Sequence, residues 1–140
     1  MTLDPGQTLA AELEIRNLIA RLAHLADDGN LDEYLELFTE DASWSHLGDT
    51  PRVGKASIGE GAEQRIRESV QGPGSGTRHL NTTLYVTIED PNHAEAISYF
   101  LYVGTRGGVV PMKTGRYIDQ FLCTTDGWKL ASRVLVEDVN

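Results

Sequence analysis

The spacing of hydrophobic residues changes once along this chain, from the period of a helix to the alternation of a strand. Apolar residues recur at helical spacing over residues 8–28, and a second, shorter helix is expected over 31–38. Gly29 is suited to the left-handed position that often follows a helix, and Asn30 with Glu33 resembles a capping box for the second helix. The first part of the chain is therefore predicted to form two consecutive helices.

The middle of the chain combines one strand signal with one helix signal. Residues 42–47 alternate, which places every second side chain on a common face. That face carries Ala42, Trp44 and His46. Ser57 and Glu60 form another candidate capping box and predict a helix over 58–70, in spite of two internal glycines. The segment 71–77 is rich in Gly, Pro and Ser and is expected to be a mobile loop.

Alternation dominates the second half of the chain, from Arg78 onward. It predicts four strands, over residues 78–89, 94–105, 114–124 and 128–137. Short turn signals such as Asp126-Gly127 separate these strands, so they should pair antiparallel. The apolar face of such a sheet must be covered by the early helices. We therefore expect one α+β domain over residues 1–140.

Charge and composition narrow the classes of partner. The chain carries 12 Lys and Arg against 21 Asp and Glu, and this formal net charge of −9 disfavours nucleic acid and anionic membranes as partners. It has no apolar run of the ~18 residues that a membrane span needs, and its first residues lack the features of a signal peptide. A cytoplasmic location is the resulting expectation. Cys123 follows two apolar residues and is expected to be a buried thiol.

The strand predicted from Arg78 separates polar and apolar residues by face. One face carries His79, Asn81, Thr83 and Tyr85, and the other carries Leu80, Thr82, Leu84, Val86 and Ile88. On an outer strand the polar face would simply meet solvent. If this face lines a cavity instead, a neutral His79 could act as a general base near pH 7.

Two adjacent aspartates end the first predicted helix, where the helix dipole disfavours negative charge. Asp27 lies at the border of the apolar stripe, whereas Asp28 points away from it and can meet His24 four residues earlier. Both aspartates could be solvated surface charges. If Asp27 turns inward, pairing with an imidazole would offset the cost of burying it.

Further candidate residues lie on the later strands. Tyr102 could belong to the core or offer its hydroxyl to a ligand. Arg133 requires an anion or a carboxylate partner if its face of the last strand points inward. The four histidines stand in different elements without metal-binding spacing, and the chain has no glycine motif for phosphate. We therefore expect no metal site and no cofactor.

Three segments of the chain are similar to a known family: EIRNLIARLAHLADDGNLDEYLELFTEDASW, TRHLNTTLYVTI and GRYIDQFLCTTDGWKLASRVL. They resemble the SnoaL-like branch of the nuclear transport factor two-like superfamily, which includes polyketide cyclases, scytalone dehydratase and a dehydrochlorinase. The resemblance covers residues 9–137. It implies a cone-shaped α+β barrel, in which a bent antiparallel sheet wraps around a long N-terminal helix and leaves one deep apolar pocket.

The resemblance also implies roles for individual residues. His79 stands where the dehydratase-like members carry their catalytic base, and Asp27 stands where an aspartate orients that base. Arg133 corresponds to an arginine that stabilises a leaving anion in the dehydrochlorinase. The residues expected to bind substrate are Trp44, His46, Tyr102, Asp119 and Arg133.

The implied function is that of a cofactor-independent lyase or isomerase, dehydratase-like or cyclase-like. It would use an Asp27–His79 pair to abstract a proton from a small apolar, cyclic substrate. The alternative is a noncatalytic binding or assembly module of the same fold, similar to the β subunit of ring-hydroxylating dioxygenases. That alternative predicts a closed pocket, or Asp27 and His79 too far apart for a hydrogen bond. The resemblance further implies a homodimer formed through the outer face of the sheet.

Overall fold

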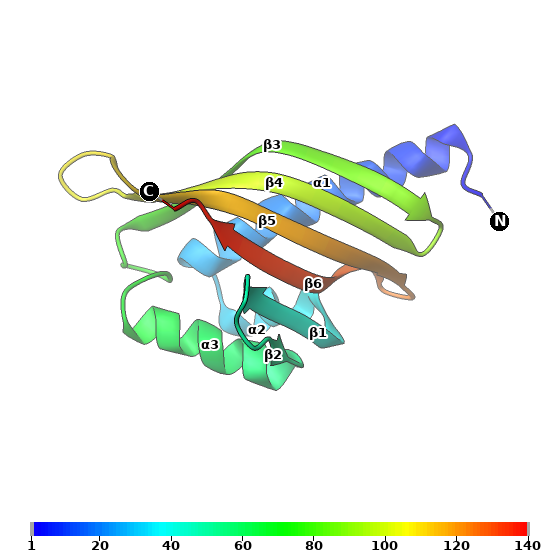
Figure 1. Ribbon diagram of the computed structural model, residues 1–140. Coiled ribbons are helices and arrows are strands. Elements are labelled where there is room, and N and C mark those ends of the chain that lie inside the picture. The colour runs from blue at the N-terminus through cyan, green and yellow to red at the C-terminus, as the bar shows by residue number, and fades with distance from the viewer. Residues whose placement is uncertain (1, 140) are drawn as a thin grey trace.

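The helices come first along the chain and most of the sheet follows, as the sequence predicts (Figure 1). The computed structural model describes residues 2–139. Its elements are α1 (Pro5–Asp28), α2 (Leu31–Glu36), β1 (Phe38–His46), β2 (Arg52–Val53), α3 (Lys55–Arg67), β3 (Thr77–Asp90), β4 (His93–Gly104), β5 (Val110–Thr124) and β6 (Gly127–Glu137). Every predicted helix and strand is present, with boundaries shifted by a few residues, and the short β2 is an addition.

The six strands form one curved sheet in the order β2-β1-β6-β5-β4-β3. The strands β3 to β6 pair antiparallel, as their short turns predict, whereas β1 pairs with β6 in parallel. Helix α1 packs against β3 and β6, and α3 packs against β1 and β2 (Figure 1). The predicted α+β fold, with a bent sheet around a long first helix, is confirmed. The sheet remains open, because β2 and β3 form its two edges.

Helix α1 ends at Asp28, as predicted, but its start and the conformation of Gly29 differ from the prediction. The helix begins at Pro5 because Asp4 and Gln7 cap it reciprocally: Gln7 N–H donates to the Asp4 side chain at 2.8 Å, and Asp4 N–H donates to the Gln7 side chain at 3.0 Å. Gly29 is extended, with a φ of −107°, so the predicted left-handed conformation is wrong. Glycine is required there for space, since a Cβ would lie 2.5 Å from the Leu25 side chain.

The start of α3 also corrects the prediction. The helix begins at Lys55 and has no side-chain cap, so the capping box of Ser57 with Glu60 is wrong. The reason lies in β2, whose pairing with β1 ends at Val53. Gly54 then turns the chain with a φ of 88°, a conformation that favours glycine, and α3 follows at once.

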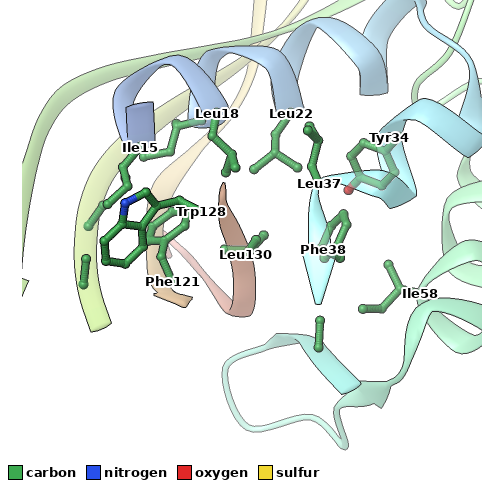
Figure 2. Close-up of a cluster of buried hydrophobic side chains, with 14 of the residues drawn as sticks. Ile15, Leu18, Leu22, Tyr34, Leu37, Phe38, Ile58, Phe121, Trp128 and Leu130 are labelled. Atoms are coloured by element: carbon green, nitrogen blue, oxygen red, sulfur yellow. The ribbon is translucent and has the colours of Figure 1, made fainter. Parts of the chain in front are cut away.

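The main hydrophobic core lies between α1 and the sheet. Figure 2 shows side chains from α1, β5 and β6 in one cluster: Ile15, Leu18, Leu22, Phe121, Trp128 and Leu130. Complete burial of side chains of this size contributes roughly 1.5–3 kcal/mol each. Tyr34 and Phe38 extend the cluster to α2 and β1, with their rings edge to face at 5.1 Å. A smaller, separate cluster consists of Phe100, Tyr102 and Tyr117.

Strand β3 changes its inward-facing side at Thr83. A β-bulge lies between Thr82 and Tyr85, and Thr83 has a φ of 49°, which is rare for a β-branched residue. Before the bulge, His79 and Asn81 face a cavity. After it, the residues that pack against the main core are Leu84, Val86 and Ile88. The prediction of one polar and one apolar face along the whole strand is therefore wrong, because the bulge shifts the alternation by one position.

Candidate active site

The last turn of α1 carries Asp27 into the interior. Its side chain is buried. Its Oδ1 lies 2.6 Å from Nδ1 of His79, and its Oδ2 accepts a hydrogen bond from the His79 backbone N–H at 2.9 Å. One carboxylate therefore holds both the ring and the backbone of the same residue. These charge-assisted contacts offset the unfavourable position of a negative charge at a helix C-terminus.

The contact with Asp27 determines which ring nitrogen of His79 is free. An ionised carboxylate only accepts hydrogen bonds, so the neutral ring carries its proton on Nδ1 and keeps a lone pair on Nε2. Within residues 2–139, Nε2 has no hydrogen-bond partner, and no fully buried side-chain nitrogen or oxygen lacks one. Nε2 is therefore accessible. The arrangement leaves Nε2 as the ring nitrogen without a partner from the described chain.

His79 lines a cavity of about 110 Å³ that opens to solvent. The apolar and aromatic residues of its lining include Leu22, Trp44, Val70, Phe100, Tyr102 and Tyr117. They come from α1, from the smaller cluster on β4 and β5, and from β1 and the segment after α3. This volume is below the ~150 Å³ of an enclosed apolar cavity that binds benzene, but the opening to solvent lets one ring enter without full enclosure.

Arg133 reaches the same cavity from β6, and Asp119 on β5 lies behind it. The Arg133 Nε and Nη2 atoms donate to the two carboxylate oxygens of Asp119 at 2.8 and 2.9 Å. Burial lowers the pKa of Arg133, but the charge of Asp119 and its hydrogen bonds outweigh this effect and hold that pKa above its ordinary value. Asp119 is fully buried and does not line the cavity, so the predicted contact between Asp119 and substrate is not found. Its role is to hold Arg133.

Tyr117 lies under the guanidinium of Arg133. The Arg133 Cζ is 3.8 Å from the centroid of the Tyr117 ring, a cation–π geometry. Burial raises the pKa of Tyr117 to about 12, and the positive charge of Arg133 reduces this increase. Tyr117 is therefore a neutral phenol near pH 7.

The face of β1 predicted to carry Trp44 and His46 does reach the cavity. Both residues line it, and their rings meet edge to face at 5.2 Å. The side chain of His46 is 45% exposed and lies 3.9 Å from Glu137, which also pairs with Lys113 at 3.2 Å. These polar groups form the solvent-exposed side of the cavity.

Of the two alternatives that the sequence left open for Tyr102, the structure shows the core residue, and the ring also lines the cavity. It is buried, and its hydroxyl donates a hydrogen bond to the Val70 carbonyl at 2.7 Å. Thr77 Oγ1 donates to the same carbonyl at 3.0 Å, and the Gln71 side chain is buried. The segment predicted to be a mobile loop is thus tied down at both ends. The Tyr102 ring packs 4.9 Å from that of His79, between centroids.

Sequence reasoning missed Arg65, a lining residue from α3. Its Nε donates to the Gln71 side chain at 2.9 Å, and its Cζ lies 4.6 Å from the centroid of the Trp44 ring. Burial lowers the pKa of Arg65 from its ordinary value. A signal was present in the sequence, because Arg65 follows Ala62 by three positions and Ile58 by seven, which places it on the buried stripe of the helix.

A comparison with family models decides which family the chain belongs to. The model of the SnoaL-like domain matches residues 7–134. The chain belongs to the SnoaL-like family. This confirms the resemblance seen in the sequence. None of the curated proteins compared with the chain matches it.

Solved structures place this SnoaL-like chain among proteins of the same fold. A Novosphingobium aromaticivorans protein described as NTF2-like with a cystatin-like fold is 25% identical, with a TM-score of 0.83 over 94% of this chain and 84% of that one. A second protein from that organism, provisionally named an aromatic ring hydroxylase, is 27% identical, with a TM-score of 0.78 over 94% and 92%. A third, provisionally named a scytalone dehydratase, is 19% identical, with a TM-score of 0.77 over 97% and 89%, and this likeness shows the fold alone.

Several predictions for the SnoaL-like chain concern residues away from the cavity. The buried thiol is wrong: Cys123 is exposed, because it lies at the end of β5 beside the hairpin to β6. His24 and Asp28 are both exposed, as expected, but no ion pair joins them in the described chain. No helix within residues 2–139 is long and apolar enough to cross a membrane. In the same range, no three His, Cys, Asp or Glu side chains cluster as metal ligands would.

Proposed function

We propose that this SnoaL-like protein is a cofactor-independent lyase or isomerase that removes a carbon-bound proton from a small, mostly apolar cyclic molecule. The observation that carries the proposal is the 2.6 Å contact between Asp27 Oδ1 and His79 Nδ1 beside an open cavity. It leaves His79 Nε2 as the acceptor nitrogen. A positioned general base of this kind accelerates a reaction by roughly 10²–10⁴-fold.

In the proposed reaction, His79 Nε2 takes the proton from carbon and the ring becomes an imidazolium. Asp27 stabilises that cation through its contact with Nδ1. In an elimination, the electron pair of the C–H bond forms the new double bond and the leaving group departs with its own bonding pair. In an isomerisation, the imidazolium returns the proton to a different carbon.

Negative charge develops on the substrate oxygen or on the leaving group, and it needs hydrogen-bond donors. Arg133 is suited to this role, because Asp119 occupies only two of its five N–H groups. His46, also in the lining, is a second donor. Tyr102 donates its hydroxyl proton to Val70, so its role is to hold the wall of the cavity beside His79.

Two observations outside the pair support the proposal. The cavity lining is largely aromatic, which suits a flat cyclic molecule. The 27%-identical relative carries a name that refers to an aromatic ring, and this association favours a cyclic substrate here as well.

The proposal is tested with a reporter of proton abstraction, 5-nitrobenzisoxazole. Loss of its C–H proton breaks the ring N–O bond and releases a coloured cyanonitrophenolate. We expect wild-type protein to accelerate this opening and the variants His79→Ala and Asp27→Asn to lose roughly 10²–10⁴-fold in rate. Circular dichroism checks that both variants remain folded.

The chain offers a matched control in a second Asp–His pair. His93 Nδ1 lies 2.9 Å from Asp90, but both side chains are about half exposed. His93→Ala and Asp90→Asn should keep the wild-type rate. Equal rates in the wild type and in both cavity variants would contradict the proposal and favour a noncatalytic module that only holds a ligand.

Homodimerisation through the outer face of the sheet and a cytoplasmic location are further proposals, which rest on the resemblance and on composition. Exposed apolar side chains on that face, including Leu80 and Tyr99, support the first of them. Sedimentation velocity of the wild type and of Tyr99→Glu tests it, since a charge at the contact should favour the monomer.

A further inference from the structure

The cavity wall contains a guanidinium, that of Arg65, which no carboxylate of the described chain neutralises. Arg65 is held by the Gln71 side chain at 2.9 Å and by the Trp44 ring at 4.6 Å. Its further polar neighbours are the phenols of Tyr34 and Tyr117 and a second guanidinium, that of Arg52, which adds positive charge rather than removing it. Within residues 2–139, no carboxylate oxygen lies within 4.0 Å of the Arg65 nitrogens.

The other two cations of the lining differ from Arg65 in this respect. Arg133 is neutralised by Asp119 through two hydrogen bonds of 2.8 and 2.9 Å. Lys113 pairs with Glu137 at 3.2 Å. Arg65 is therefore the lining cation whose charge no carboxylate of the described chain compensates.

A half-buried positive charge without a counter-charge is unfavourable, because it has lost part of its hydration. Burial accordingly lowers the pKa of Arg65, although an arginine remains charged at neutral pH. Gln71 and Trp44 fix the orientation of the planar group before any ligand arrives. A guanidinium fixed in this way offers a fork of N–H donors that matches the two oxygens of a carboxylate.

We infer that Arg65 binds the carboxylate of the substrate, so that the substrate class is small cyclic carboxylic acids. This inference rests on the proposed function, because it places the substrate of that reaction in the same cavity. The carboxylate contacts Arg65, the ring lies on the aromatic lining, and the acidic C–H group faces His79 Nε2. The net charge of −9 gives no long-range attraction for an anion, so recognition depends on this local contact.

The test compares two ligands of nearly the same shape, benzoate and the neutral benzamide, by NMR titration of the full chain. We expect benzoate to bind the wild type more tightly than benzamide. Arg65→Met should weaken benzoate by about 10- to 100-fold, the range for a hydrogen bond to a charged group, and weaken benzamide by much less, since the amide carries no charge. The matched control is Arg67→Met, on the same helix but with a side chain that is 69% exposed. It should bind benzoate as the wild type does.

Three results would overturn the inference: no benzoate binding to the folded wild type, equal affinity for the two ligands, or benzoate affinity unaffected by Arg65→Met. Should Arg65→Met fail to fold, Arg65→Lys replaces it, since lysine keeps the charge but loses the fork and should bind benzoate more weakly. Binding of benzoate involves no proton transfer. If benzoate binds through Arg65 while 5-nitrobenzisoxazole is not opened, the carboxylate site stands and the base role fails; the reverse pair of results removes the carboxylate site alone.

Discussion

Two buried aspartates hold a basic side chain at the same cavity, and they do so in different ways. Asp27 uses one oxygen for the ring of His79 and the other for the His79 backbone. Asp119 directs both oxygens to the guanidinium of Arg133. Each basic side chain also lies against a tyrosine ring, His79 against Tyr102 and Arg133 against Tyr117. Both arrangements consist of an aspartate, a basic side chain and a tyrosine ring. They differ in whether the basic side chain can exchange a proton.

The difference concerns the proton. The imidazole of His79 has two ring nitrogens, and its contact with Asp27 leaves one of them free to accept a hydrogen bond or a proton. Guanidinium keeps its charge at every accessible pH, and Asp119 increases that tendency by raising the pKa of Arg133. Under the proposed function the first pair transfers a proton, whereas the second provides a permanently charged group in a fixed position.

The largest expected effect is a loss of stability when the Asp119–Arg133 pair is broken. Asp119→Ala leaves the Arg133 guanidinium buried without a partner, which should cost about 3–5 kcal/mol of the free energy of unfolding. Urea denaturation measures this loss. The double replacement Asp119→Leu with Arg133→Met is the control and should be close to the wild type, since it removes both charges together. A loss below about 1 kcal/mol in the single variant would show that solvent already compensates Arg133.

The next effect concerns the ring of His79. In Asp27→Asn, an amide N–H group beside Nδ1 should favour the tautomer that carries its proton on Nε2, which removes the acceptor. The expected loss of stability is about 1–3 kcal/mol, because hydrogen bonds to a charged group are weakened rather than a charge left unpaired. Nitrogen NMR of the labelled imidazole identifies the protonated nitrogen. An unchanged tautomer in the variant would mean that Asp27 does not select it.

The two tyrosines provide a smaller test. Tyr102→Phe removes the hydrogen bond to Val70 and should cost about 0.5–1.5 kcal/mol. The ring that packs on His79 remains. Thermal denaturation detects the loss, and hydrogen exchange should show faster exchange in the segment after α3. If stability and exchange are both unchanged, the hydroxyl does not hold this wall of the cavity.

The smallest effect at neutral pH is that of Tyr117→Phe, which should appear only in alkali. The pKa of Tyr117 is about 12 in the folded chain, above the ~10 of an unfolded tyrosine. The unfolded state therefore loses its proton first, and the stability due to the neutral phenol is present below pH ~10 and lost between pH ~10 and ~12. At pH 11 the wild type should have lost about 1 kcal/mol relative to the variant. Urea midpoints at pH 8 and pH 11 measure the difference, and parallel losses would contradict the assignment.

The hydrophobic pattern predicted the architecture because helical spacing and strand alternation both depend only on residues that are close in sequence. The stripe that includes Ile15, Leu18 and Leu22 needs only helical spacing, and the four late strands need only alternation and turns. The failures occurred where a distant contact decides. The start of α3 is decided by the pairing of β2 with β1, and the bulge at Thr83 has no recognisable local signal. Gly29 is an exception, since its contact with Leu25 is local but leaves no mark in the hydrophobic pattern.

The candidate site could be predicted only where the resemblance to the family indicated which residues belong to it. Burial of Asp27 and its approach to His79 followed from the helix border and the strand face together with that resemblance. The placement of Asp119 behind Arg133 depends on the cross-strand register of β5 and β6, which alternation does not determine. Arg65 was missed because a charged residue on a helix is ordinarily assigned to solvent.

The bulge in β3 has a consequence for how such a cavity can be altered. Before Thr83, His79 and Asn81 line the cavity. After it, every second residue from Leu84 to Ile88 packs against the main core, so one continuous strand performs two separable tasks. Substitution of Asn81 can therefore alter the cavity without repacking the main core and without removing the Asp27–His79 contact. Deletion of a single residue at the bulge would disrupt the core instead. It would turn the side chains of one half of the strand to the opposite face of the sheet. The fold should thus tolerate substitution at Asn81 but not deletion of a residue at the bulge, two positions later.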